Sequence, residues 1–279
     1  MEQVTVRVPA STSNLGPGFD CLGVALRIYN NVTLRRGQKS RLPPIATAAA
    51  NLFFKRTRRT RFPFSFFCSD DVPPARGLGA SATIRLGILH GFNELTGRSL
   101  DKLSIFHLAA QLEGHPDNVA PASLGGFTVA RGTIVQRFAV APALRFVLII
   151  PDLEINTSNA RKILPRRLGR TEAVESCGNA CAIAAAFASQ RYENLRGAFV
   201  DHLHQPFRAK LIPFLPRVIA AAEKAGALGA FLSGSGSTIC AVTLHEPQKI
   251  AAAMQWAARS TKSRVIITTA DNRGVQISN

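Results

Sequence analysis

Residues 113–121 read EGHPDNVAP and place two carboxylates, one imidazole and one side-chain amide within six positions. Carboxylates bind hard cations and accept protons, while an imidazole or an amide forms hydrogen bonds to a polar substrate. Each residue also has a plainer explanation, because Glu113 could end a surface helix and His115 could be a satisfied core residue. The proline, aspartate and asparagine that follow His115 at once favour a loop at a polar site.

A glycine-rich segment, PPARGLGASAT at residues 73–83, leads into a stretch with helical periodicity. Between Thr83 and Leu95 the apolar residues at 84, 88, 92 and 95 fall on one helical face. A helix N-terminus has unpaired N–H groups and a partial positive charge, so a polyphosphate is a suitable ligand there. The segment is neither a Walker loop nor a GxGxxG fingerprint, and alone it could be only a tight connection.

A second glycine-rich segment, SGSGST at residues 233–238, lies between two apolar runs. Such a segment can be a hairpin turn between two strands, and a glycine-rich backbone can also approach a ligand closely. The two interpretations are compatible. We therefore expect this segment to contribute the shape of its backbone to the site.

These segments need strands and helices to position them, and the sequence predicts both. Alternation, apolar runs and helical periodicity indicate the elements, which turn residues separate. Strands are expected at residues 3–10, 62–67, 145–155 and 264–270, the last of these being the final strand of the chain, with strand pairs at 24–36 and around 234–237. Helices are expected at residues 44–56, 83–95, 104–114, 172–188 and 216–226. The loose VAPAL connection before the strand at 145 suggests two domains, residues 1–143 and 144–279.

Length and composition are those of a globular protein. The chain has 279 residues, of which 46% are hydrophobic and 18% charged, enough for one large or two modest domains. It has no apolar run long enough to cross a membrane and no signal-peptide pattern at its start. The five cysteines are odd in number and lack metal-site spacing, so we expect reduced core thiols and a cytoplasmic protein.

The charge is strongly positive, with 34 Lys and Arg against 17 Asp and Glu and a net charge of +17. Such a balance attracts anions, whether nucleic acid, membrane headgroups or phosphorylated small molecules. The densest basic run, KRTRRTRFPF from Lys55 to Phe64, has aromatic neighbours, so nucleic acid is one candidate partner. We favour the plainer interpretation of a solvated surface segment.

Taken together, the motifs resemble those of homoserine kinases, a branch of the GHMP kinase superfamily. The two glycine-rich segments are typical of the superfamily, whereas SNLGPGFD and EGHPDNVAP are narrower and point to the homoserine kinase branch. Matching segments, in chain order, are residues 6–26, 73–83, 112–127, 155–165, 204–208 and 226–242. The resemblance implies a two-domain α+β GHMP kinase fold, with a domain like the second domain of ribosomal protein S5 followed by a ferredoxin-like domain. It also implies a possible homodimer.

For the nucleotide, the resemblance implies ATP bound with Mg²⁺. The cofactor-binding positions that match the family are Asn51, Arg76, Gly77, Leu78, Gly79, Ala80, Ser81, Ala82, Gly234, Ser235 and Gly236. The hydroxyl of Ser81 and the carboxylate of Glu113 match the metal region, which suits an ion that takes few protein oxygens and completes its shell with phosphate and water. We count Ser81, Glu113 and Asp117 as the catalytic residues.

For the substrate, the resemblance implies L-homoserine, an amino acid with a terminal hydroxyl. Arg161 and Arg208 match the family arginines that grip its carboxylate, as guanidinium forks do well. The matching polar pocket consists of Asn14, Asp20, His115, Asp117 and Asn118, with Thr157 as a neighbouring hydroxyl. Asp117 is the tempting general base, although transfer without a strong protein base is also open. The expected products are O-phosphohomoserine, on the route to threonine, and ADP.

The chain departs from the family pattern in three places. Ala80 replaces the first serine of the usual pair, Ser237 stands where proline is common, and residues 35–70 are short and rich in arginine. Two alternatives to homoserine kinase stay open. One is another GHMP alcohol kinase, acting for example on mevalonate or shikimate, and the other is a basic nucleic-acid-binding protein on a lapsed kinase scaffold.

Overall fold

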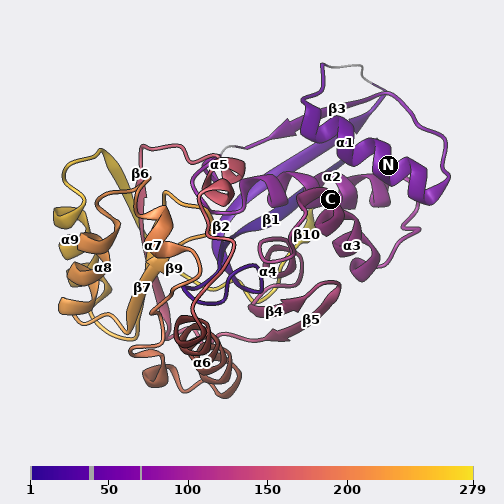
Figure 1. The fold of residues 1–279 in the computed structure, drawn as a ribbon. Helices are drawn as coiled ribbons and strands as arrows, with labels where there is room; N and C mark the ends of the chain where they lie inside the picture. Colours follow the sequence, from indigo (N-terminus) through magenta and orange to yellow (C-terminus); the bar gives the residue numbers. More distant parts are fainter. Residues whose placement is uncertain (1, 38–40, 70, 279) are drawn as a thin grey trace.

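Two antiparallel sheets, side by side, organise the chain (Figure 1). The computed structural model describes residues 2–37, 41–69 and 71–278. Within this part the larger sheet has six strands in the order β10-β1-β2-β4-β5, and β3 also pairs with β2. Its strands are β1 (Gln3–Ser13), β2 (Leu22–Arg36), β3 (Phe64–Cys68), β4 (Phe127–Arg131), β5 (Ile134–Phe138) and β10 (Gln276–Ser278).

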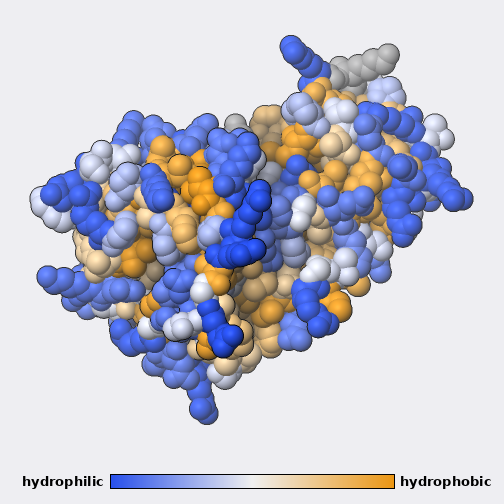
Figure 2. All heavy atoms as spheres, viewed as in Figure 1, coloured by the Kyte–Doolittle hydropathy of each residue, from blue (hydrophilic) through white to orange (hydrophobic). Residues whose placement is uncertain are grey.

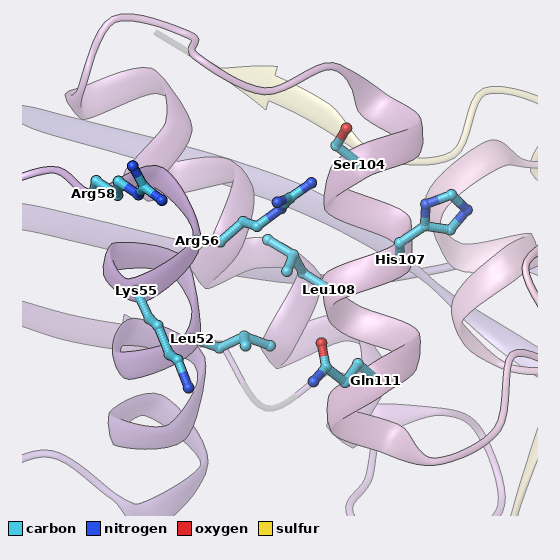
Figure 3. A pocket seen from close by; sticks show the side chains of 8 residues that line it. All are labelled: Leu52, Lys55, Arg56, Arg58, Ser104, His107, Leu108 and Gln111. Carbon is cyan, nitrogen blue, oxygen red and sulfur yellow. The ribbon is translucent and has the colours of Figure 1, made fainter.

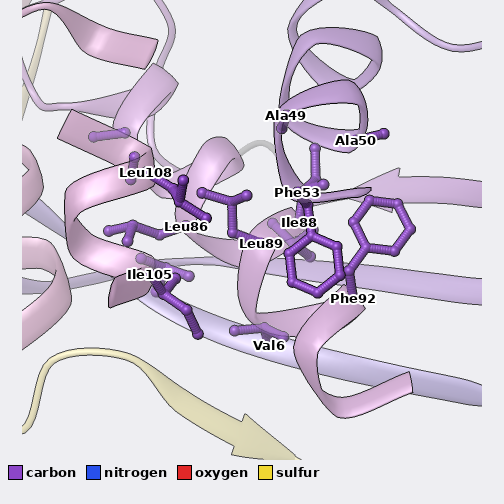
Figure 4. Close-up of a cluster of buried hydrophobic side chains, with 14 of the residues drawn as sticks. Val6, Ala49, Ala50, Phe53, Leu86, Ile88, Leu89, Phe92, Ile105 and Leu108 are labelled. Atoms are coloured by element: carbon purple, nitrogen blue, oxygen red, sulfur yellow. The ribbon is translucent and has the colours of Figure 1, made fainter. Parts of the chain in front are cut away.

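Helices cover one face of the larger sheet (Figure 1). They are α1 (Pro44–Thr57), α2 (Ala80–Leu95), α3 (Lys102–Glu113) and α4 (Val119–Leu124). Their apolar sides meet in one core with strand residues such as Val6, and in Figure 4 the rings of Phe53 and Phe92 lie together there. Their ring centroids are 5.5 Å apart. Burying a side chain of this size contributes about 1.5–3 kcal/mol. This core therefore fixes the position of α2, and with it the glycine-rich loop from which α2 begins.

Local signals place the ends of α3. The carboxylate of Asp101 caps the N-terminus by accepting a hydrogen bond from the N–H of Ser104, 2.7 Å away. Gly114 ends the helix in the left-handed conformation, with φ at 82°. Glu113 is therefore the last helical residue, and the chain turns immediately afterwards into the polar loop at residues 115–118.

The smaller sheet has the order β7-β8-β6-β9. Its strands are β6 (Arg145–Pro151), β7 (Gly229–Leu232), β8 (Ile239–Thr243) and β9 (Ser263–Thr269). Two helices, α8 (Leu215–Lys224) and α9 (Pro247–Ala257), alternate with these strands, which gives the predicted ferredoxin-like arrangement. The remaining elements are α5 (Thr157–Lys162), α6 (Arg170–Ser189), the 3₁₀ turn η1 (Tyr192–Leu195) and α7 (Gln205–Arg208).

The central strand β6 is buried on both faces, which explains its continuous apolar sequence. Val147 and Ile149 pack into the core with α8 and α9. Residues on the other face, such as Leu148, join a second core that also contains Phe127 of β4 and Phe187 of α6. Those two rings stack with centroids 4.2 Å apart. One apolar core thus continues from the larger sheet into the smaller half of the molecule.

Three expectations about elements need correction. Residues 24–36 form no strand pair, because β2 is one long strand whose start pairs with β4 and whose end pairs with β3. The strand at 264–270 is followed by another, β10, which pairs with β1. Among the cysteines, Cys177 and Cys181 are exposed on α6 and not in the core. The division of the chain at residue 143 stays a prediction. The strand β10 comes after that residue in the sequence, but it belongs to the larger sheet.

None of the helices in the described ranges is both long and apolar enough to cross a bilayer.

Buried His90 on α2 gives a test of this packing. Its Nε2 atom has no hydrogen-bond partner among the described residues. Burial, with a smaller contribution from Lys102, lowers the pKa of His90 from 6.5 to about 4. Between these values the unfolded chain binds a proton that the folded chain does not, so the stability from neutral His90 is lost as pH falls.

We expect His90→Leu to lose less stability than the parent chain on acidification, because the variant has no imidazole to protonate at this position. Between pH 7 and pH 5 the parent chain should lose about 2 kcal/mol more of its unfolding free energy than the variant does. Urea denaturation at the two pH values measures it. Equal losses in the two proteins would contradict the buried, neutral state of His90.

Candidate active site

A cavity of about 520 Å³ lies between the two halves of the molecule, a usual size for a small-molecule site. Both halves line it. The larger half contributes the segment after β1, the loop before α2, one face of α2 and the loop after α3, and the smaller half contributes α5, α7 and the β7–β8 loop. The polar segments that the sequence singled out therefore meet in one place.

The loop before α2 approaches neighbouring backbone so closely that it requires glycine. Gly77 and Gly79 have φ of +75° and +69°. A Cβ atom on Gly77 would lie 2.1 Å from the carbonyl oxygen of Ser233, and one on Gly79 would lie 2.3 Å from the hydroxyl of Ser11. Because no side chain caps the start of α2, its first N–H groups are open to an anion in the cavity.

The loop between β7 and β8 packs directly on the loop before α2. The hydroxyl of Ser233 donates to the carbonyl oxygen of Gly77 at 2.6 Å and accepts from the hydroxyl of Thr12 at 2.8 Å. The N–H of Gly234 donates to the carbonyl oxygen of Ser13 at 3.1 Å. The hairpin predicted around residues 233–238 is confirmed, since Leu232 pairs with Ile239 across it.

The loop after α3 holds one acid, Asp117, and one amide, Asn118. Asp117 is buried, and burial together with the negative charge of Asp20 raises its pKa. Its Oδ1 atom accepts the N–H of Asn118 at 2.9 Å. The amide of Asn118 is fixed in turn, because it donates to the hydroxyl of Ser13 and accepts from that of Ser11, each at 2.9 Å.

Across the cavity, Arg161 of α5 forms a two-pronged ion pair with Asp20. The Nη1 and Nη2 atoms of Arg161 donate to the two carboxylate oxygens at 3.0 and 2.5 Å. Asp20 has a left-handed backbone with φ at 60°, as does Asn14, whose Oδ1 atom accepts the N–H of Asp20. These uncommon backbone conformations bring the side chain of Asn14 to the backbone of Asp20 within the segment after β1.

Arg208 is buried, with 2% of its surface exposed, and carbonyl oxygens replace the usual acid partner. Its Nη1 atom donates to the carbonyl of Gly234 at 2.9 Å, and its Nε atom donates to that of Ala160 at 3.3 Å. Burial and the nearby charge of Arg161 lower its pKa to about 10, so it stays a cation at neutral pH.

A neutral histidine positions this guanidinium. The Nε2–H of His204 donates to the carbonyl of Gly16 at 2.9 Å, which leaves Nδ1 to accept from Arg208 Nη1 at 3.3 Å. Burial lowers the pKa of His204 to about 4, in agreement with a neutral imidazole. Both Arg161 and Arg208 lie over the ring of Phe19, with each Cζ atom 5.3 and 5.2 Å from its centroid.

Most of the predicted site residues line this cavity. They are Asn14, Asp20, Arg76, Gly77, Leu78, Gly79, Ala80, Ser81, Glu113, His115, Asp117, Asn118, Thr157, Arg161, Arg208, Gly234 and Ser235. The hydroxyls of Thr157 and Ser235 lie 3.2 Å apart, so they join α5 to the β7–β8 loop. Arg76 lines the mouth and pairs with Asp152 at 3.0 Å.

Three predicted nucleotide residues do not line the cavity. Asn51 is on the exposed side of α1, where its Oδ1 atom accepts from Arg61 at 2.6 Å. Ala82 follows Ser81 on α2 but packs in the core. At Gly236 an added Cβ would meet Ile212 and Leu232, so this residue faces the inside of the smaller half.

Sequence reasoning missed several lining residues, among them Phe19, Ile45, Ile84, Arg85 and Asn156. The residues Ser81, Ile84 and Arg85 follow the i, i+3, i+4 spacing of one helical face, so this signal was available for α2. Arg85 matters most for the chemistry, because its Nη1 atom donates to the carboxylate of Glu113.

The donors present suit Mg²⁺ in type and number. Ser81 and Glu113 offer hard oxygens in the same cavity. Among the described residues no cluster of three or more acidic, histidine or cysteine side chains could hold a metal ion by itself. An ion at Glu113 would therefore depend on phosphate oxygens, as Mg²⁺ commonly does.

The basic run predicted near Lys55 lies elsewhere. Lys55, Arg56 and Arg58 line a separate groove of about 510 Å³ between α1 and α3, and Figure 3 shows Leu52 and Arg56 reaching toward α3. This groove shares no lining residue with the cavity. On the face in Figure 2, hydrophilic side chains spread over both halves and are not gathered in one stripe.

Comparison with known proteins identifies the family. The models of the GHMP kinases N terminal domain and C terminal domain match residues 44–126 and 182–258. The chain is 40% identical to a homoserine kinase of Deinococcus radiodurans, over 84% of this chain and 82% of that one. The chain belongs to the homoserine kinases of the GHMP family. A homoserine kinase of Clostridium beijerinckii is 37% identical over 86% of both chains.

Solved structures agree with this membership. The crystal structure of homoserine kinase from Cytophaga hutchinsonii superposes with a TM-score of 0.91 at 28% identity, over 100% of this chain and 98% of that chain. The predicted family and the two-domain GHMP kinase fold are thus confirmed. Membership among the homoserine kinases makes this protein an ATP-dependent small-molecule kinase.

The crowding at Gly79 predicts the effect of adding one methyl group. We expect Gly79→Ala to raise the dissociation constant of ADP about tenfold or more, because the methyl must displace Ser11 from beside the loop before α2. Gly97→Ala is a matched control, since Gly97 follows the same helix with φ at +89° and open space around it. Isothermal titration calorimetry compares them, and equal affinities would contradict the role of this close approach.

Proposed function

We propose that the protein transfers the γ-phosphoryl group of ATP to the side-chain hydroxyl of L-homoserine. The products are O-phosphohomoserine, on the route to threonine, and ADP. The observation that carries the proposal is one cavity that joins an uncapped helix N-terminus to an arginine–aspartate pair and a second, buried arginine. The names of the related proteins point to the same substrate.

On the nucleotide side, the N–H groups at residues 77–81 are suited to hold the triphosphate. Ser81 and Glu113 are the oxygens that would hold Mg²⁺ beside it. Bound there, the ion would compensate charge on the phosphoryl group being transferred. Arg76, which directly precedes Gly77, lines the cavity and pairs with Asp152 at 3.0 Å and with Glu154 at 3.4 Å.

On the substrate side, the pair between Arg161 and Asp20 has the same charges as an amino acid's own ends. A substrate carboxylate can replace Asp20 on Arg161, while the substrate ammonium is accepted by Asp20. Arg208 adds a second guanidinium beside the first over Phe19. This arrangement favours an amino acid over mevalonate or shikimate, which have no ammonium group.

Asp117 is the proposed acceptor of the substrate's hydroxyl proton. It lines the cavity, and burial raises its pKa, which makes its carboxylate a better base than an exposed aspartate. His115 and Asn118 border the same loop and are suited to orient the hydroxyl by hydrogen bonds. A nucleic-acid-binding protein on a lapsed kinase scaffold would not need these groups together, which argues against that alternative. A homodimer and a cytoplasmic location stay predictions.

A substrate panel tests the proposed function. We expect homoserine to give the highest kcat/KM in an assay of ADP release, ahead of serine, mevalonate and shikimate. 4-Hydroxybutyrate, which is homoserine without its ammonium group, should be at least about 10²-fold poorer, because it leaves Asp20 without its partner. No preference for homoserine would end the proposal.

The role of Asp117 is tested separately with Asp117→Asn, which keeps shape and removes the base. We expect kcat to fall about 10²- to 10⁴-fold while KM for homoserine changes little. Rapid-quench measurement of phosphoryl transfer at saturating substrates gives the rate. A raised KM with an unchanged rate would assign Asp117 to substrate binding instead.

A further inference from the structure

The cavity contains an ion pair at the position where the metal ion is expected. Arg85 lies one helical turn after Ser81 on α2, and Glu113 ends α3. The Nη1 atom of Arg85 donates to Oε1 of Glu113, and the two side chains are only 20% and 16% exposed. Both line the cavity. The carboxylate that would hold Mg²⁺ therefore already has a cation beside it.

The guanidinium of Arg85 has an N–H group that donates no hydrogen bond to the described residues. Its Nε atom is buried and has no hydrogen-bond partner among the described residues. The Nε atom of Arg161 is likewise buried without a partner among the described residues, but both Nη atoms of Arg161 donate to Asp20. Arg208 donates to two carbonyls. Leaving a buried N–H group without an acceptor costs free energy. A ligand that brings an acceptor to this N–H group would remove that cost.

A triphosphate on α2 would supply that acceptor. Arg85 projects from the same helical face as Ser81, next to the uncapped N-terminus where phosphates are expected. Phosphate oxygens accept guanidinium N–H groups as well as a carboxylate does. Glu113 carries a single negative charge, so Arg85 and a metal ion beside it would repel each other and compete for that charge when both are offered.

We propose that Arg85 is an exchangeable counter-ion, which neutralises Glu113 in the free enzyme and moves to the triphosphate when nucleotide and metal bind. Arg85 thereby lowers the affinity of Glu113 for a metal ion without nucleotide. After the exchange its guanidinium adds positive charge beside the phosphates during phosphoryl transfer. The inference rests on the proposed function, because it takes the cavity to be the ATP site.

The exchange predicts that Arg85→Met shifts two affinities in opposite directions. Manganese ion alone, followed by electron paramagnetic resonance, should bind the variant about tenfold more tightly, because Glu113 is then free. The ATP analogue AMP-PNP with excess magnesium, followed by calorimetry, should bind about tenfold more weakly, because a charged contact to phosphate is lost. Arg85→Lys should recover part of the analogue's affinity.

Arg98→Met serves as the control, since it removes an arginine–glutamate pair from the exposed end of the same helix. This control should match the parent in both titrations. A merely structural role of Arg85 would weaken both affinities together, and that result, or no change in either one, would overturn the inference. If Arg85→Met fails these tests while the parent still phosphorylates homoserine, the exchange is wrong and the proposed function stands.

Discussion

The contact between the two glycine-rich loops is the constraint on which the site depends. Gly77 has no room for a side chain because the backbone of Ser233 lies against it, and the Ser233 hydroxyl donates back to the Gly77 carbonyl. The next residue extends the contact to the substrate side, since the carbonyl of Gly234 accepts from both Asn14 and Arg208. The loop before α2, which we propose binds phosphate, and Arg208, which we propose binds the substrate carboxylate, are thus fixed relative to each other before any ligand arrives.

Short-range sequence patterns were sufficient for the parts of the site that local physics determines. The periodicity after Thr83 located α2, and the glycines before it located the tight loop that we propose binds phosphate, because only glycine tolerates such a conformation and such close approach. The motif around Glu113 and Asp117 located the polar loop, since Gly114 ends the helix there. These features depend on neighbours in sequence, which is why one chain was enough to find them.

The parts that depend on distant neighbours could not be found in this way. Nothing near Phe19 shows that two arginines more than a hundred positions away lie over its ring. Asn51 matched a family position, yet the direction it faces depends on how α1 rotates over the core. The strand β10 pairs with β1 through backbone groups, and three residues at the end of a chain give no pattern to indicate it.

The charges of the cavity are compensated from within by groups that resemble its proposed ligands. Asp20 presents to Arg161 the carboxylate that an amino acid would bring, and Arg85 presents to Glu113 the positive charge that a metal ion would bring. Without such partners a half-buried ion would lose much hydration and favour its neutral form. Binding then becomes an exchange of one partner for another within a fixed frame, so little of the interaction energy is consumed by desolvation or by ordering the side chains. A site of this kind discriminates by the charge pattern of the ligand, because a molecule that lacks one of the charges leaves a protein ion without a replacement partner.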